Sequence, residues 1–187
     1  LREFELILGF TAYNDIKKMA AHYANSWALL GRPTAVYDPK LNWTFGSPSV
    51  LYLYYRESGR LAEHARDLIE YMPGYNRLTG GHGSGGEYIM EGERLFNLGD
   101  FAGTEIAAYK ARYKAQEAGQ PNIAFCADYL QIRLAFMQGD GGRVFELLQK
   151  MREEMTEKKD YQLIHLVEIC EGSVYAALKQ KDKIPKK

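Results

Sequence analysis

The sequence predicts an all-α fold in which antiparallel helix pairs are stacked into a solenoid. A motif, F-x-x-G-D, occurs at residues 96–100 and again at residues 136–140, an offset of 40 positions. A Glu-Gly pair at Glu91 and Gly92 returns 80 positions later at Glu171 and Gly172. No segment alternates apolar and polar residues with the period of two that is typical of a half-buried strand. Self-similarity at one fixed period is the signature of a helical-repeat architecture.

Each Gly-Asp pair predicts a hinge between two antiparallel helices. Glycine adopts the left-handed conformation that ends a helix at little steric cost. An aspartate directly after it can accept hydrogen bonds from the free N–H groups that open the next helix. Forty residues before Gly99 lies Gly59, and forty residues after Gly139 lies Lys179. Glycine is replaced at Lys179, but polar residues still interrupt the apolar pattern there. Four unrelated surface turns are the alternative, which the constant spacing and the flanking phenylalanines disfavour.

Composition excludes several functional classes. With 24 basic and 24 acidic residues the formal net charge is zero, whereas a nucleic-acid-binding domain usually carries a basic surplus. No apolar run reaches the length of a membrane span, and no signal-peptide pattern opens the chain. We therefore expect a cytoplasmic protein without membrane contact. Cys126 and Cys170 lie in apolar helical patterns and are expected to be reduced and buried.

The N-terminal part of the sequence predicts two helices and an irregular connection. Residues 1–9 are expected to form a short helix closed by Gly9. Thr11 is expected to cap a second helix that runs to Leu30 and ends at Gly31. Residues 32–47 contain prolines that interrupt helices but are too apolar for a free linker, so a packed irregular connection is expected.

The next helix pair is predicted over residues 48–59 and 60–72. Ser47 and Pro48 resemble an N-cap followed by proline at the first helical position. Pro73 and Gly74 are expected to end the second helix of the pair. A glycine-rich stretch at residues 80–86 then separates this pair from the regular part of the chain.

The C-terminal part predicts five helices of similar length. Their expected ranges are residues 87–98, 101–118, 121–138, 142–157 and 160–179. The whole chain is therefore predicted to be one helical-repeat domain over residues 1–187. Its repeats are expected at roughly 1–47, 48–79, 80–119, 120–159 and, in part, 160–187.

The repeat resembles the tetratricopeptide consensus of an aromatic, a small and a large residue, a Gly-Asp-aromatic turn and further small residues. These are Tyr88, Gly92, Leu95, the turn at Gly99, Asp100 and Phe101, and then Ala108 and Ala111. The unit differs from that consensus because it is 40 rather than 34 residues long and because Thr104 stands where alanine is expected. The resemblance implies a right-handed superhelix of antiparallel helix pairs.

Longer units of this kind are similar to the tetratricopeptide-like sensor region of bacterial transcription regulators of the MalT/LuxR class. The segments that carry this similarity are residues 71–83, 151–153 and 182–185. The resemblance implies a piece of a longer chain in which an ATPase precedes the solenoid and a helix-turn-helix domain follows it. The expected function is then non-enzymatic sensing of an effector or protein partner, with DNA contacted only through the missing C-terminal domain. The alternative is a free-standing tetratricopeptide-type scaffold that binds a peptide or helix in its groove.

The glycine-rich stretch is the first candidate binding segment. Backbone N–H groups before a helix can hold an anion, but a nucleotide-binding P-loop needs a lysine and a preceding strand that this stretch lacks. A flexible connection between repeats is one interpretation. The other is a small-ligand or partner contact through Arg77, His82 and Glu87. An enzyme that uses the His82 loop is disfavoured, because no catalytic constellation, cofactor motif or metal-ligand spacing accompanies it.

Tyrosines are the second candidate binding feature, with 14 in the chain. First helices of such solenoids line the concave face, and tyrosine offers a large rigid surface with a polar tip. Tyr54, Tyr88 and Tyr129 are therefore expected to contact a small-molecule effector or protein partner in the concave groove. Half-buried packing is the alternative role for these side chains, and the sequence leaves the oligomeric state open.

Overall fold

A computed structural model describes residues 3–12, 15–41, 48–49 and 58–184, and this part of the chain is all-helical. It contains eight α-helices and one short 3-10 helix, and the described residues form no strand. The predicted all-α class is therefore confirmed for this part of the chain. The helix predicted over residues 48–59 lies largely outside the described residues.

The first two helices differ at their ends from those predicted. Helix α1 (Phe4–Thr11) continues through Gly9, and the Thr11 hydroxyl donates to the Leu8 carbonyl, 2.8 Å away, rather than capping α2. Helix α2 (Ile16–Leu30) is capped by Asp15, whose carboxylate accepts a hydrogen bond from the Lys18 N–H. The predictions that Gly9 ends the first helix and that Thr11 caps the second were therefore wrong. Gly31 ends α2 in the left-handed conformation, as predicted (φ +64°).

Helix α3 (Leu61–Leu78) contains Pro73, so the prediction that proline ends this helix was wrong. An interior proline removes one backbone hydrogen bond and its ring crowds the preceding turn, at a cost of about 3 kcal/mol. Pro73 lies on the solvent side of α3, whereas Met72, Tyr75 and Leu78 are buried on the other side. Burial of these large side chains, each worth about 1.5–3 kcal/mol, offsets the cost of the proline.

The remaining helices are regular in length and spacing. They are α4 (Gly86–Leu98), α5 (Phe101–Glu117), α6 (Pro121–Met137), α7 (Gly141–Glu157) and α8 (Tyr161–Ala177), followed by the 3-10 helix η2 (Lys181–Lys183). From α5 to η2, each element begins 20 residues after the previous one. The residue two positions before each start has a positive φ: Gly99, Gly119, Gly139, Lys159 and Lys179. The predicted caps are confirmed, because the Asp100 and Asp140 carboxylates accept hydrogen bonds from the N–H groups of Gly103 and Arg143.

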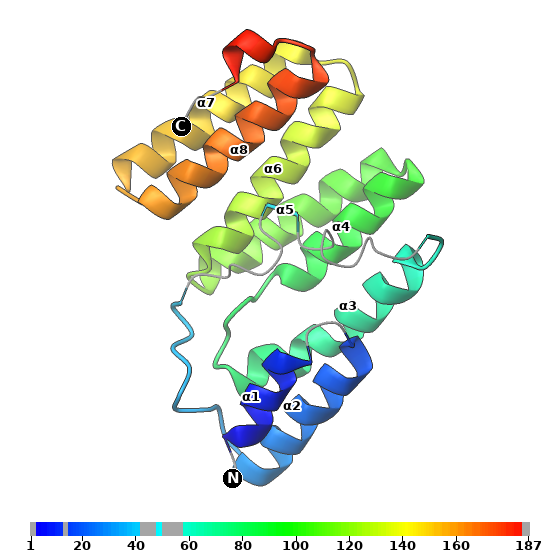
Figure 1. The fold of residues 1–187 in the computed structure, drawn as a ribbon, viewed down its shortest axis with the longest axis vertical. Helices are drawn as coiled ribbons and strands as arrows, with labels where there is room; N and C mark the ends of the chain where they lie inside the picture. Colours follow the sequence, from blue (N-terminus) through cyan, green and yellow to red (C-terminus); the bar gives the residue numbers. More distant parts are fainter. Residues whose placement is uncertain (1–2, 13–14, 42–47, 50–57, 185–187) are drawn as a thin grey trace.

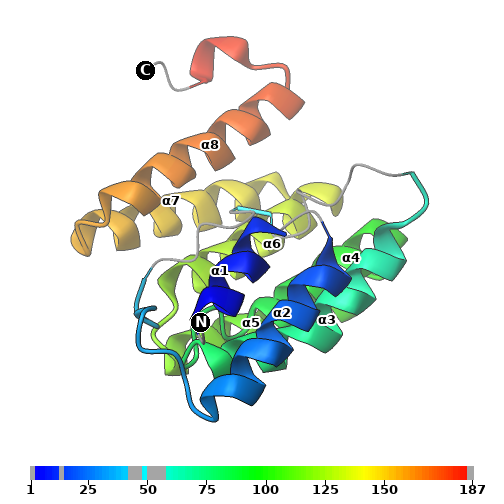
Figure 2. The ribbon, with the colours of Figure 1, turned by 60° about the horizontal axis from the view of Figure 1, so that its bottom comes forward.

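Each helix packs mainly on its neighbours in sequence (Figure 1). In addition, α6 contacts both α4 and α8, so these three helices form one side of the stack and α5 and α7 the other. Figure 1 shows α7 and α8 at one end of the molecule and α1, α2 and α3 at the other, and Figure 2 shows from a second direction that α7 lies between α6 and α8. Helix α6 thus lies in the middle of the C-terminal half and touches four other helices.

Two clusters of buried apolar residues lie in the described part of the chain, and both include residues of α6. The N-terminal cluster contains Leu6, Ile16, Met19, Tyr23, Ala65, Leu68, Met72, Tyr75, Leu78, Ile89, Met90, Ala111, Ala115, Ile123, Cys126 and Ala127. The C-terminal cluster contains Phe125, Ile132, Ala135, Val144, Leu148, Met151, Met155, Leu163, Val167, Cys170 and Val174. Different faces of α6 therefore supply side chains to the two clusters.

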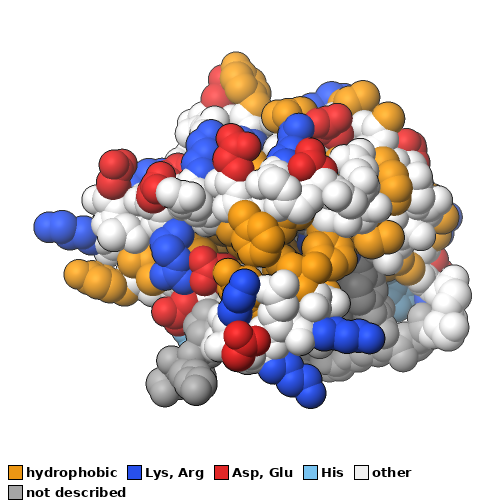
Figure 3. Space-filling model, turned by 90° about the horizontal axis from the view of Figure 1, so that it is seen from above, with side chains coloured by type: hydrophobic (Ala, Val, Ile, Leu, Met, Phe, Trp, Pro, Cys, Tyr) orange, Lys and Arg blue, Asp and Glu red, His pale blue; other side chains and the backbone are white. Residues whose placement is uncertain are grey.

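The last helix leaves apolar side chains on the surface. Ile169 of α8 and Leu178 directly after it are exposed, as is Tyr161 at the start of the helix. Figure 3 looks onto the end of the molecule that is uppermost in Figure 1 and shows apolar side chains gathered between charged ones. The stack of helices therefore ends on a partly apolar surface.

The irregular segment after α2 is packed, as predicted for its described part. The Thr34 N–H donates to the carbonyl of Leu78, 2.8 Å away, which fixes the segment to the end of α3. Tyr37 stacks on Phe10 with 5.5 Å between the ring centroids. Residues 42–47 lie outside the described part of the chain.

Both cysteines are buried, as predicted, one in each core cluster. Burial raises the pKa of the Cys170 thiol well above its usual range. We expect neither thiol to react with a thiol-exchange reagent at mildly alkaline pH until the protein unfolds. Absorbance of the released chromophore, measured with and without concentrated guanidinium chloride, tests this. Fast reaction of either thiol in the native protein would contradict it.

Candidate functional site

His82 lies inside the molecule rather than on a binding surface. Its side chain is buried, and its Nδ1 is 2.7 Å from the Tyr75 hydroxyl. The Tyr37 ring meets it edge-on, with 4.8 Å between centroids. Burial also raises the pKa of Tyr75, so this hydroxyl stays protonated and available as a donor. In this arrangement His82 joins α3 to the segment after α2.

Glu87 lies in the first turn of α4 and binds both the backbone before the helix and a side chain of α5. One carboxylate oxygen accepts a hydrogen bond from the Gly85 N–H at 3.1 Å, and the other is 2.5 Å from the Lys114 ammonium of α5. The hydrogen bond with Glu87 raises the pKa of Lys114. The same ammonium lies 5.6 Å from the centre of the Tyr88 ring. Glu87 and Tyr88 therefore both hold α4 against α5.

The glycine-rich stretch is a packed turn, which contradicts the interpretation of a flexible connection. Residues 82–86 are all buried. The Gly83 N–H donates to the Gln120 side chain at 2.8 Å, and the Gln120 amide donates to the Pro39 carbonyl at 2.7 Å. Gln120 therefore joins the stretch to the α5–α6 turn and to the segment after α2. This role of Gln120 was not predicted.

The other predicted binding residues lie elsewhere. Arg77 is exposed on α3 and places its guanidinium 4.3 Å from the centre of the Trp27 ring. Tyr129 of α6 packs against the C-terminal cluster, and burial raises its pKa. Tyr54 lies outside the described residues. The contacts shown for Arg77 and Tyr129 thus differ from those of His82, Glu87 and Tyr88.

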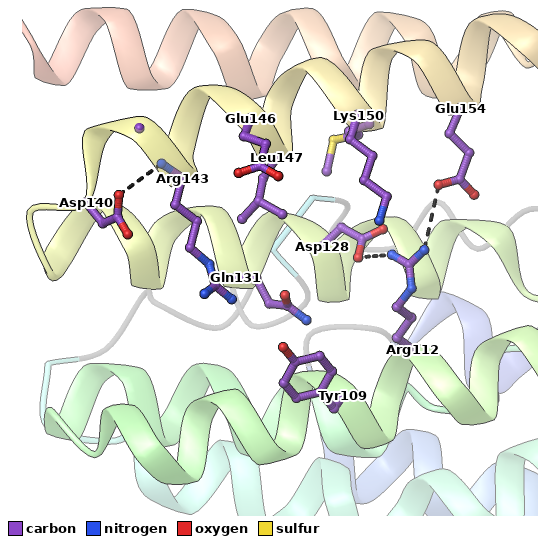
Figure 4. Close-up of a pocket in the computed structure, with 12 residues that line it drawn as sticks. Tyr109, Arg112, Asp128, Gln131, Asp140, Arg143, Glu146, Leu147, Lys150 and Glu154 are labelled. Atoms are coloured by element: carbon purple, nitrogen blue, oxygen red, sulfur yellow. Dashed lines mark hydrogen bonds and ion pairs between the residues drawn. The ribbon is translucent and has the colours of Figure 1, made fainter.

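A groove between α5 and α7, with α6 as its floor, is the candidate binding site (Figure 4). It has a volume of about 680 Å³, within the range of ligand sites in proteins. Its lining residues come from only these three helices and from the cap of α7: Tyr109, Arg112, Asp128, Gln131, Asp140, Gly142, Arg143, Glu146, Leu147, Lys150, Met151 and Glu154. Binding was predicted on the first helices of the repeats; of these, α6 contributes Asp128 and Gln131 to the groove, whereas α4 and α8 contribute no lining residue.

One end of the groove is built around Arg112. Its guanidinium binds Asp128 directly and lies 3.7 Å from Glu154 (Figure 4). Burial raises the pKa of Asp128 despite the attraction of Arg112, whereas a hydrogen bond from Lys158 lowers the pKa of Glu154. This ion-pair network ties α5, α6 and α7 together at this end.

The α7 wall carries charges of alternating sign on successive turns. Arg143, Glu146, Lys150 and Glu154 follow one another at intervals of three or four residues, so they share one face of the helix. Arg143 lies 3.7 Å from Glu105 of α5, an exposed and weak contact. Within the described part of the chain, Glu146 and Lys150 form no ion pair. The Lys150 charge nevertheless helps to lower the pKa values of Asp128 and Glu154, so Lys150 belongs to the charge network around Arg112.

Gln131 is the most informative side chain of the groove. It is only 8% exposed and points from α6 into the groove on the side of Tyr109 (Figure 4). No other described residue forms a hydrogen bond with its side chain. The Gln131 carboxamide faces the solvent-filled groove and presents a donor and an acceptor at its floor. The sequence signal for it is weak: Asp128 and Gln131 are one turn apart in an otherwise apolar helix.

Across the described residues, no three His, Cys, Asp or Glu side chains gather closely enough to hold a metal ion. None of the helices in this part of the chain is both long and apolar enough to span a bilayer.

Comparison of the chain with protein-family models, with curated proteins and with solved structures gave no match.

Proposed function

We propose that this chain is a non-catalytic binding module of stacked helix pairs, and that the groove between α5, α6 and α7 holds its effector or partner. The observation that carries the proposal is Gln131, whose side chain points into the groove and forms no hydrogen bond with another described residue. Its carboxamide therefore offers a donor and an acceptor to a ligand in the groove.

The proposed architecture is a right-handed, tetratricopeptide-like solenoid with about 40 residues in each helix pair. Support comes from the 20-residue spacing of the helix starts and from the contacts of α6 with α4 and α8. In such a stack each unit contacts only its neighbours, so grooves between units are natural binding sites. Helices α5 and α7 belong to successive units, and the groove lies between them.

Within this proposal, the module is the sensor region of a larger regulator similar to the MalT/LuxR class. A ligand that touches α5 and α7 together favours one spacing of these helices over others. The resulting shift in domain arrangement is limited by the difference in ligand affinity between the two states. The support for this step is the sequence resemblance together with the placement of the groove. DNA would be contacted only by a domain outside this chain.

A free-standing scaffold is the alternative, and the full open reading frame separates the two. Flanking ATPase and helix-turn-helix segments are expected for the regulator. An open reading frame without them would contradict the regulator and leave the scaffold.

A thermal-shift screen of metabolites and short peptides tests the binding function. A ligand at 100 times its Kd stabilises the folded state by about 2.7 kcal/mol, so the wild-type melting temperature is expected to rise. The rise in melting temperature is expected to persist in Gln149→Leu. Gln149 is an exposed glutamine of α7 that does not line the groove. It is expected to be lost or strongly reduced in Gln131→Leu. Equal rises in all three proteins would contradict binding in the groove.

A further inference from the structure

We infer that the outer face of α8 is a docking surface for an amphipathic α-helix of a partner protein, with acidic side chains at one end of that helix. The outer face is the side of α8 that carries His165, Ile169, Gly172 and Ala176. These residues follow one another at intervals of three or four, so they share one side of the helix. In the described part of the chain, the α-helices that pack on α8 are α6 and α7, and Figure 2 shows no α-helix beyond α8 on the other side.

The corresponding face is covered in both earlier copies of this helix. Residues 40 and 80 positions before the outer face of α8 lie on α6 and α4. On α4, Ile89 is 0% exposed. A Cβ atom at Gly92 would lie 2.8 Å from Leu130 of α6 and 3.3 Å from Ala107 of α5. On α6, Ile132 is 0% exposed inside the C-terminal cluster, whose other members include residues of α7 and α8. The helices that follow α4 and α6 therefore pack against this face.

On α8 the corresponding positions are open. Ile169 is 43% exposed, against 0% for Ile89. Gly172 corresponds to Gly92, but a Cβ atom there would meet only the Ile184 side chain at 3.6 Å, an ordinary contact distance. Glycine weakens a helix interior relative to alanine, and the described surroundings of Gly172 give no steric reason for it. Close approach of another helix, of the kind seen at Gly92, provides such a reason.

The repeat indicates that the occupant is a helix. Both earlier copies of the outer face receive α-helices, and the chain keeps the same register after α8, since η2 begins 20 residues after α8 does. The η2 helix has only three residues, so it leaves Ile169 exposed. With 17 residues, α8 is about 25 Å long, and a partner helix of similar length would cover it. Apolar side chains at intervals of three or four on that helix would bury Ile169.

Lysines flank the C-terminal end of the outer face. Lys179, Lys181 and Lys183 are exposed and form no ion pair with another described residue. They lie beside the face, because Ile184, directly after η2, packs next to Gly172. Acidic side chains at one end of a partner helix would be complementary to these lysines.

A second copy of this chain is a poor match for this end of the face. In a parallel pair of α8 helices, the lysines of the two copies would face one another. In an antiparallel pair they would face the start of α8, where Lys158 and Lys159 precede Asp160. Like charges placed opposite one another oppose association. The charges therefore favour a different protein as the partner.

Selection from a displayed library of amphipathic helical peptides of about 18 residues tests the inference. The apolar face of the peptides is fixed, and the other positions are randomised among acidic, basic and neutral residues. We expect the enriched peptides to carry acidic residues at one end. Their Kd values are measured by fluorescence anisotropy. The Kd is expected to rise as sodium chloride is added, because salt screens the attraction between the lysines and the acidic residues.

Gly172→Leu is the decisive variant. Its side chain would keep a partner helix away from α8, so the Kd is expected to rise about tenfold or more. Its folding stability is expected to stay the same or to increase, because leucine is a better helix former than glycine and the site has room for it. Lys181→Glu combined with Lys183→Glu is expected to raise the Kd of the acidic peptides and to remove most of its salt dependence. Gln149→Leu, a change of an exposed residue on α7, is the control and is expected to leave the Kd within about twofold of wild type.

The contrary outcomes differ from one another. Failure to enrich any peptide, or equal binding to wild type and Gly172→Leu, would exclude docking on the outer face. Enrichment of basic or neutral peptides would exclude an acidic partner. Self-association that Gly172→Leu abolishes, measured by sedimentation velocity, would show that a second copy covers the face. Binding to this chain but not to the protein encoded by the full open reading frame would show that another segment of the same protein does so. None of these results bears on the groove, whose ligand is tested separately with Gln131→Leu.

Discussion

Replacing Gly85 with alanine is expected to lower the free energy of unfolding by about 3 kcal/mol or more. Gly85 has φ +95°, a conformation that costs other residues about 1–2 kcal/mol. A Cβ atom at this position would lie 2.7 Å from the Ala111 carbonyl oxygen and 3.2 Å from the Ile123 side chain. Because a backbone oxygen cannot rotate away, α4 would have to move relative to α5. Urea denaturation followed by circular dichroism measures the loss.

Gly99→Ala is the matched control for this prediction. Gly99 has nearly the same backbone conformation (φ +79°), but nothing lies within 4 Å of the position of its Cβ. Only the conformational cost of about 1 kcal/mol is then expected. Lys159 and Lys179 already occupy equivalent positions before α8 and η2 with positive φ, which shows that this turn accepts a side chain. A loss for Gly85→Ala no larger than for Gly99→Ala would disprove the close approach of α4 and α5.

Replacing Gln120 with alanine is expected to cost about 2–4 kcal/mol of folding free energy. The substitution leaves the buried Gly83 N–H and the Pro39 carbonyl without their partner. Each buried group left unsatisfied costs about 1–3 kcal/mol, and the small side chain also leaves a void. The loss is expected to be local, so amide hydrogen exchange should accelerate at Gly83 and in the segment after α2 more than in α8. Mass spectrometry of exchange, combined with urea denaturation, measures both effects.

Gln116→Ala provides the comparison for Gln120→Ala. Gln116 is exposed near the end of α5, where a change to alanine is expected to alter stability by about 0.5 kcal/mol or less. Its exchange pattern is expected to match that of wild type. Uniformly faster exchange across the whole Gln120→Ala protein would show that Gln120 supports the global fold rather than one junction.

The C-terminal helices could be predicted from the sequence because their ends are encoded locally. Glycine before the start and aspartate at the cap specify each turn without reference to distant residues, and the helices begin within one or two residues of the predicted positions. The N-terminal helices could not be predicted as well, because distant contacts decide them. Gly9 remains inside α1 because the Tyr23 ring of α2 occupies the space beside it. Pro73 remains inside α3 because the buried face of that helix outweighs the loss of one hydrogen bond.

Little of the candidate site could be predicted from the sequence. His82, Glu87 and Gln120 are polar residues near glycines, a pattern that favours binding and structural bridging equally. Only the folded arrangement shows that Glu87 pairs with Lys114 and that Gln120 joins three segments. Gln131 lies in an otherwise apolar helix. Its side chain reaches the groove without a hydrogen bond to another described residue because α5 and α7 are separated there. That separation is a tertiary feature with no local sequence signal.

The division of the core into two clusters has a consequence for cooperativity. Helix α6 is the element that contributes to both clusters, so the N-terminal and C-terminal halves of the molecule are joined mainly through its two faces. The groove crosses this same boundary, with α5 on one side and α7 on the other. An occupant that touches both walls would link the unfolding of one half to that of the other. Ligand binding is then expected to stabilise both halves together and not only the half that supplies one wall.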